Sequence, residues 1–344
     1  MGRSGTRTDS FVYAVDRAAY ERINTVTLLI FSSQGQKTAS IGDLAHLLET
    51  ETDTLWLDIT GPDEDDIHLM RDVFHFHPLA IEDTRNQRQR PKVEEYADYL
   101  FFILNAVSLD GNMAAFRELD VFIGKNYIVT VHTDAEPVIQ ETHRRIERLG
   151  SAVPMSPSYL LYVVIDTVVD SYFPVLDLIE EELERMGDDI LRNPRQETLN
   201  DLFELKQILI DLWRVIWPQR EILNNLVHQK PSFIDVESLQ HHLRDVTDHL
   251  MWIADMITTF RDALTSIAEV YMSAVSNRLN KVVNRLTVFT VVIGISGVLT
   301  GFYGMNFEHT WPPFSSPWGV PFVLVLMGVI AGTLLYVLRK LNWY

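Results

Sequence analysis

Two long uncharged apolar segments near the C-terminus constrain this fold more than any other feature of the sequence. The first runs from Leu286 to Phe307, 22 residues, and the second from Trp318 to Leu338, 21 residues. Each is long enough to cross a hydrocarbon layer of roughly 30 Å as a helix. Two such segments are rare in the core of a soluble protein. The short connection between them, which contains Pro312 and Pro313, therefore predicts a helical hairpin in a membrane.

Basic residues flank the predicted hairpin on one side only, and their positions predict its orientation. Arg278, Lys281 and Arg285 precede the first span, Arg339 and Lys340 follow the second, and the loop 305–317 has none. We therefore expect an external loop and a cytoplasmic tail at 339–344. The sequence opens without an apolar signal segment, so the N-terminal domain is also predicted to be cytoplasmic. Together these features predict a multi-pass protein of the inner (plasma) membrane.

Charge and residue usage exclude several functional classes. The formal net charge is −18, and the acidic residues lie almost entirely before the first span, which disfavours nucleic acid as a partner and suits cations. Because there is no cysteine, disulfides and thiolate metal sites are excluded. The sequence contains no phosphate-binding loop, dinucleotide fingerprint, zinc-protease motif or serine nucleophile elbow. We therefore predict that the protein is not an enzyme.

The segments before the spans differ in their secondary-structure pattern. Residues 1–24 are polar and predicted to be poorly ordered, whereas residues 25–150 mix strand and helix signals and predict an α/β domain. Residues 151–233 predict a long antiparallel helix pair. Its helices are expected over 157–192 and up to about 229, with a kink at Pro218. The predicted strands are Thr25–Phe31, Thr54–Thr60, Tyr99–Ser108, Glu118–Ile123 and Tyr127–His132, the last two joined by a hairpin at Gly124–Asn126.

A long stalk helix is predicted over residues 234–304. Its apolar residues are spaced alternately three and four apart, which is a heptad pattern, and it continues without Pro or Gly into the first span at about 286–304. A helix with such a seam needs partners, in the same chain and in identical subunits. The seam consists of Leu243, Val246, Leu250, Ile253, Ile257, Phe260, Leu264, Ile267, Tyr271 and Ala274.

Small and polar residues recur every three or four positions along the first span, on one predicted face of the helix. The stripe consists of Asn280, Asn284, Thr287, Thr290, Gly294, Gly297 and Gly301. Two interpretations remain open: close helix packing, for which Gly297 and Gly301 have the right spacing, or the lining of a narrow polar path. The Asn306 amide would offer uncharged carbonyl oxygens to a hydrated cation at the outer end. Glu308 would attract cations to the loop.

The segment Tyr303–Glu308 resembles the Y-G-M-N signature of the CorA magnesium channels, and it stands, as in that family, after the first of two C-terminal spans. The resemblance extends over residues 25–344. It includes four further segments, His77–Asp83, Arg88–Lys92, Ile216–Glu221 and Ser276–Arg278.

The resemblance implies a funnel-shaped homopentamer in which the stalk helix lines the pore. It implies a selectivity filter of Gly304, Met305 and Asn306, and regulatory Mg²⁺ held between subunits by Asp83 and Asp245. It places Asn280, Val283, Leu286, Gly294 and Gly297 along the pore, to which the stripe adds Thr290. Many members carry bulky residues in mid-span where this chain has Gly294, so Val283 and Leu286 are the better gate candidates.

The predicted function is a passive channel for Mg²⁺ influx that also admits Co²⁺ or Ni²⁺, driven by membrane potential and gated by intracellular Mg²⁺. The expected partners are identical subunits, the lipid bilayer and divalent cations, with Mg²⁺ both transported and regulatory and no organic cofactor. One alternative is Zn²⁺ transport on the same scaffold; Met305 favours the magnesium branch. A more distant alternative is a membrane-anchored sensor.

Overall fold

The computed structural model describes residues 25–340 apart from 33–34, 51, 88, 111–112, 135, 151–152, 193–194, 230–233, 306–310 and 312–316. An N-terminal α/β domain is followed by long helices and an apolar C-terminal helix, in agreement with the predicted fold class. The chain divides into two compact units: residues 1–186 with 200–265, and residues 187–199 with 266–344.

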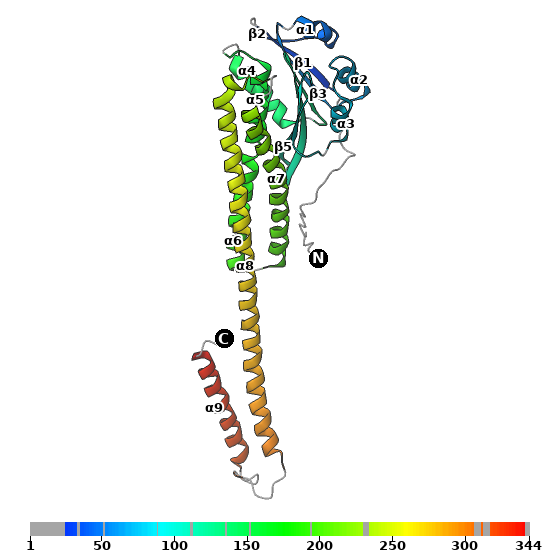
Figure 1. Ribbon diagram of the computed structural model, residues 1–344. Coiled ribbons are helices and arrows are strands. Elements are labelled where there is room, and N and C mark those ends of the chain that lie inside the picture. Colours follow the sequence, from blue (N-terminus) through cyan, green and yellow to red (C-terminus); the bar gives the residue numbers. More distant parts are fainter. Residues whose placement is uncertain are drawn as a thin grey trace. The chain divides into compact units, whose positions relative to one another are not determined.

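A seven-stranded mixed sheet forms the centre of the first unit, with strand order β2-β1-β3-β7-β6-β5-β4 (Figure 1). The neighbours β3 and β7 are parallel, and every other adjacent pair is antiparallel. The hairpin predicted at Gly124–Asn126 joins β6 to β7. The strands are β1 Thr25–Ser32, β2 Gly35–Thr38, β3 Thr54–Thr60, β4 Lys92–Glu95, β5 Leu100–Asp110, β6 Met113–Ile123 and β7 Tyr127–His132. The sequence did not predict the short edge strands β2 and β4.

Helices cover both faces of the sheet. On one face lie α1 (Leu44–Thr50, after the 3₁₀ turn Ile41–Asp43), α2 (Glu64–Asp72) and α3 (Pro78–Asn86). Their apolar residues pack on alternate residues of the central strands to form a buried core. On the other face lie α4 (Pro137–Leu149) and α5 (Pro157–Asp170), where the Trp56 ring stacks on the His143 ring at 4.1 Å.

The long helix predicted over 157–192 is wrong in one respect, because the structure divides it into α5 and α6 (Phe173–Arg192). The cause is Pro174, which has no N–H to donate and whose ring collides with the carbonyl four residues earlier. At the break Tyr172 is fully buried, and its hydroxyl donates to the Asn105 carbonyl at 2.5 Å. The next helix, α7 (Gln196–Gln229), contains Pro218 in its interior.

The stalk prediction is confirmed as α8, a single helix of 68 residues from Val236 to Tyr303. Its heptad seam is buried: Leu250 and Ile253 are 0% exposed, and burial continues through Leu264. The last helix, α9 (Gly319–Lys340), covers the second predicted span.

Candidate ion pathway and regulatory residues

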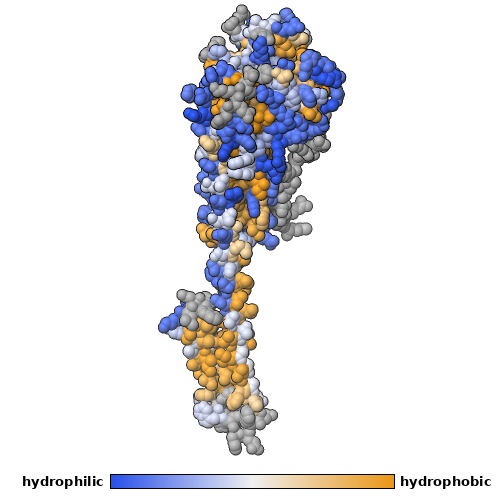
Figure 2. Space-filling view, in the orientation of Figure 1, coloured by the Kyte–Doolittle hydropathy of each residue, from blue (hydrophilic) through white to orange (hydrophobic). Residues whose placement is uncertain are grey.

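Three helical segments among the described residues are long and apolar enough to cross a membrane. In Pro157–Arg192, 61% of the most apolar stretch of 18 residues is buried inside the protein, so the apolar residues of this segment belong to the core. The corresponding share is 6% for α8 and 0% for α9, and Figure 2 shows hydrophobic surface over both. These two helices therefore present apolar side chains outward, as a lipid environment requires.

The residues predicted to line the pore share one side of α8. Six of them are exposed, and none has a charged side chain: Asn280, Val283, Leu286, Thr290, Gly294 and Gly297. A Cβ added at Gly297 would meet no atom within 4 Å. The Thr290 hydroxyl donates to the Leu286 carbonyl at 2.9 Å, so its donor is used within the helix and its oxygen can still accept.

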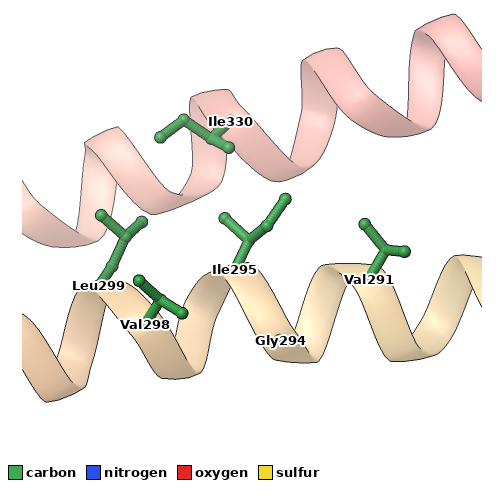
Figure 3. Close-up of a pocket in the computed structure, with 6 residues that line it drawn as sticks. All are labelled: Val291, Gly294, Ile295, Val298, Leu299 and Ile330. Carbon is green, nitrogen blue, oxygen red and sulfur yellow. The ribbon is translucent and has the colours of Figure 1, made fainter.

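The opposite side of α8 faces α9. Val288 is buried, and Ile295 and Leu299 point toward α9 across an open apolar hollow of about 410 Å³ that is also lined by Ile330 (Figure 3). Gly294, although exposed, also lines this hollow.

The polar stripe predicted from the sequence differs from this exposed side at two positions. Asn284 and Thr287 are half-buried, whereas Leu286 is 65% exposed. The reason is geometric, because each residue turns the helix by 100°, and a one-residue choice between Leu286 and Thr287 moves the stripe by that angle. The pore positions implied by the family resemblance lie on the exposed side, and their lining of a pore stays a prediction.

A tight turn ends α8 at the candidate filter. The Gly304 N–H donates to the Thr300 carbonyl at 2.8 Å, and a Cβ at Gly304 would lie 3.1 Å from that same oxygen. Glycine is therefore suited to this close approach. Met305 follows in a bend and is 53% exposed. Asn306 and Glu308 lie outside the described residues.

The first candidate regulatory residue, Asp83, belongs to α3 and is engaged by a lysine. The Lys92 ammonium lies 2.7 Å from Asp83 Oδ2 and 2.6 Å from Glu94 Oε1. Partial burial opposes the charge on Lys92, but the two carboxylates outweigh it and raise the Lys92 pKa. Partial burial likewise opposes ionisation of Glu94, yet hydrogen bonds from Lys92 and Tyr96 lower the Glu94 pKa. Both groups are thus charged near neutral pH.

The second candidate, Asp245, is exposed on α8. No hydrogen bond or ion pair joins it to Asp83 within the described part of the chain. One turn further along α8, His249 lies close to Asp166 and Asp170 of α5. Each of the three side chains offers one atom that could bind a metal ion, and these atoms lie within 4.8 Å of one another.

Arg145 forms ion pairs with both aspartates of this three-residue group. Its guanidinium lies 2.7 Å from Asp166 Oδ2 and 2.5 Å from Asp170 Oδ2. Burial, and then the Asp170 charge, raise the Asp166 pKa. Neither this group nor the Lys92 pair was identified from sequence. The i, i+4 spacing of the two aspartates on α5 was the available signal for the group, but the sequence does not show that Arg145 reaches both.

Comparison with known proteins places these features in a family. Residues 51–340 match the family described as "CorA-like Mg2+ transporter protein". The chain belongs to this CorA-like family. Its members are transport proteins and not enzymes, and α8 and α9 are accordingly its transmembrane helices.

Individual CorA-like proteins match most of this chain. The "Cobalt/magnesium transport protein CorA" of Thermotoga maritima is 34% identical over 311 residues, 89% of this chain and 88% of that protein. The "Putative metal ion transporter YfjQ" of Bacillus subtilis is 30% identical over 293 residues, 84% of this chain and 89% of that protein. The complete structure of the CorA magnesium transporter from Methanocaldococcus jannaschii has a TM-score of 0.79 at 22% identity, covering 93% of this chain and 99% of that one. This last similarity supports the fold alone.

Proposed function

We propose that this CorA-like chain forms a homopentameric channel for passive Mg²⁺ influx across the inner (plasma) membrane, with both termini cytoplasmic. The observation that carries the proposal is the exposed, uncharged side of α8 opposite the α9-facing side. A helix face exposed to water would be expected to carry charged residues, but this one carries none. Its residues form an uncharged row that consists of Asn280, Val283, Leu286, Thr290 and Gly297. Around a narrow axis, it would line a pathway of intermediate polarity.

The chemistry of this row suits a cation that keeps its hydration shell. Mg²⁺ releases its waters reluctantly and prefers oxygen ligands. Thr290 and Asn280 offer oxygen acceptors without fixed charge, and Asn306 would form the outer ring of the filter with Gly304 and Met305. Glu308 in the loop would concentrate cations at the entrance. Val283 and Leu286 are the apolar positions of this row and would close the pathway by excluding water.

Transport in this scheme needs no nucleotide. A divalent ion gains roughly 4.6 kcal/mol per 100 mV of inside-negative potential, twice the value for a single charge. Transport would instead be regulated by closing the channel. In the closed state, intracellular Mg²⁺ would bridge Asp83 of one subunit and Asp245 of the next. Because Asp245 and the exposed row belong to the same helix, α8, a change at this bridge would act directly on the pathway.

Flux into liposomes tests the proposal. The purified full chain, reconstituted with a Mg²⁺-sensitive dye inside, should give Mg²⁺ entry that increases with an inside-negative K⁺ diffusion potential. Asn306→Ala should reduce this entry. Absence of Mg²⁺ flux, or flux indifferent to Asn306→Ala, would contradict the proposal. Competition by Co²⁺, Ni²⁺ and Zn²⁺ in the same vesicles identifies the preferred ion.

A further inference from the structure

Lys92 occupies the carboxylate that the regulatory ion would use. It is the first residue of the edge strand β4, and its ammonium contacts one oxygen of Asp83 and one of Glu94. The three side chains are 32%, 22% and 37% exposed, in the order Lys92, Asp83, Glu94. A soluble cation that binds Asp83 would therefore meet Lys92 at the same partly buried anionic position.

The two carboxylates that hold Lys92 are not equivalent. Glu94 is fixed by a second hydrogen bond, because the Tyr96 hydroxyl donates to Glu94 Oε2 at 2.8 Å. Tyr96 is itself held in an aromatic stack, with its ring centroid 4.8 Å from that of Tyr99 and 5.3 Å from that of His77. Within the described residues, Lys92 is the only side chain that forms an ion pair with Asp83. Glu94 thus serves as an anchor for the Lys92 ammonium, and Asp83 is the carboxylate from which the ammonium can dissociate.

We propose that Lys92 acts as a tethered competitor cation that sets the Mg²⁺ concentration at which the Asp83 site fills. This inference rests on the regulatory role proposed above for Asp83. An arriving Mg²⁺ must displace the ammonium from Asp83 or bind beside it against like-charge repulsion, and either event weakens its binding. Because the displaced ammonium stays on Glu94, it is not left without a counter-ion, and the exchange remains reversible.

A purely structural ion pair makes a different prediction from a competitor. If Lys92 only stabilises the α3–β4 corner, removing it lowers stability equally at every Mg²⁺ concentration. If it competes, removing Lys92 must tighten Mg²⁺ binding, and removing the Glu94 anchor must loosen it, because the ammonium then rests on Asp83 alone. The two substitutions should then shift the Mg²⁺ dependence in opposite directions, and the Lys92 shift should exceed the shift caused by removing a nearby cation that does not contact Asp83.

The experiment titrates Mg²⁺ against the thermal unfolding midpoint of the purified full-length protein, since a ligand of the native state raises that midpoint. Lys92→Met keeps the aliphatic stem, and Lys92→Gln is a second variant in case the first does not fold. Glu94→Gln removes the anchor. Arg85→Met is the matched control, because it deletes a cation from the same helix as Asp83, where Arg85 pairs with the exposed Glu64. Asp83→Asn tests the site itself.

Lys92→Met or Lys92→Gln should lower the half-saturating Mg²⁺ concentration by roughly two- to fivefold, the factor expected for one partly exposed ion pair. Glu94→Gln should raise it, and Arg85→Met should leave it within error of the unmodified protein. Unchanged half-saturation in both Lys92 variants, together with loss of the Mg²⁺ effect in Asp83→Asn, would overturn the competitor role alone. A Mg²⁺ effect that survives Asp83→Asn would overturn the regulatory site and this inference with it.

Discussion

Substitution of Gly297 can show whether the exposed side of α8 lines a pore or packs against another helix. Gly297 is exposed, lies opposite the α9-facing residues, and has open space where a Cβ would stand. Gly297→Leu should therefore fit the single chain without a clash. It should even favour the helix, since glycine inside a helix costs roughly 0.5–1 kcal/mol relative to alanine.

The same substitution should block transport. In the proposed homopentamer, five leucine side chains would replace five hydrogen atoms around the axis, and a hydrated cation would have to pass them. We expect Mg²⁺ flux to fall more than tenfold, which requires only about 1.4 kcal/mol of additional barrier. The loss of flux would thus accompany an unchanged or increased thermal stability.

Gly328→Leu provides the matched control. Gly328 is also exposed within a membrane helix, has no atom within 4 Å of an added Cβ, and belongs to α9. Its substitution should leave flux nearly unchanged. Flux in vesicles and the size of the detergent-solubilised assembly are measured for both variants. Equal flux loss in the two variants would refute the reasoning. So would dissociation of the assembly by Gly297→Leu, because the glycine would then serve helix packing.

Three further predictions concern the first unit. Asp83→Asn combined with Asp245→Asn should weaken Mg²⁺ protection against limited proteolysis, and unchanged protection would remove both residues from the regulatory role. Leu250→Ala deletes a fully buried seam side chain and should cost about 2–5 kcal/mol of unfolding free energy, measured by denaturant titration; a change below 1 kcal/mol would contradict the burial of the seam. Burial opposes the charged form of His132, but its contacts with Asp58, at 3.2 Å, outweigh burial and raise the His132 pKa. The stabilisation is then complete below the unfolded-state pKa of about 6.5 and is lost as pH rises through the higher folded-state pKa, so Asp58→Asn should flatten the pH profile of stability.

The large features of this fold follow from the sequence because they rest on length and period. An uncharged stretch of more than 20 residues has few alternatives to a membrane helix, and a heptad repeated from Leu243 to Tyr271 specifies one buried seam. The central strands β3 and β7 were also predictable, because their residues are apolar and β-branched.

The features that escaped prediction depend on tertiary contacts or on a single residue. The strands β2 and β4 are short and hydrophilic, and only pairing with β1 and β5 makes them strands. Pro174 ends a helix that apolar periodicity alone would continue. The pair of Lys92 with Asp83 brings together residues from α3 and β4, and no spacing rule in the sequence indicates it.

Cysteine accessibility along α8 tests most directly that this helix lines the ion pathway. The chain contains no cysteine, so each substitution introduces the only thiol in the protein. We predict that Cd²⁺ or a charged thiol reagent blocks Mg²⁺ flux when the cysteine stands at Val283, Leu286, Thr290 or Gly297, and has no effect at Val288, Ile295 or Leu299. Block at the α9-facing positions, or the absence of block along the exposed row, would contradict the account.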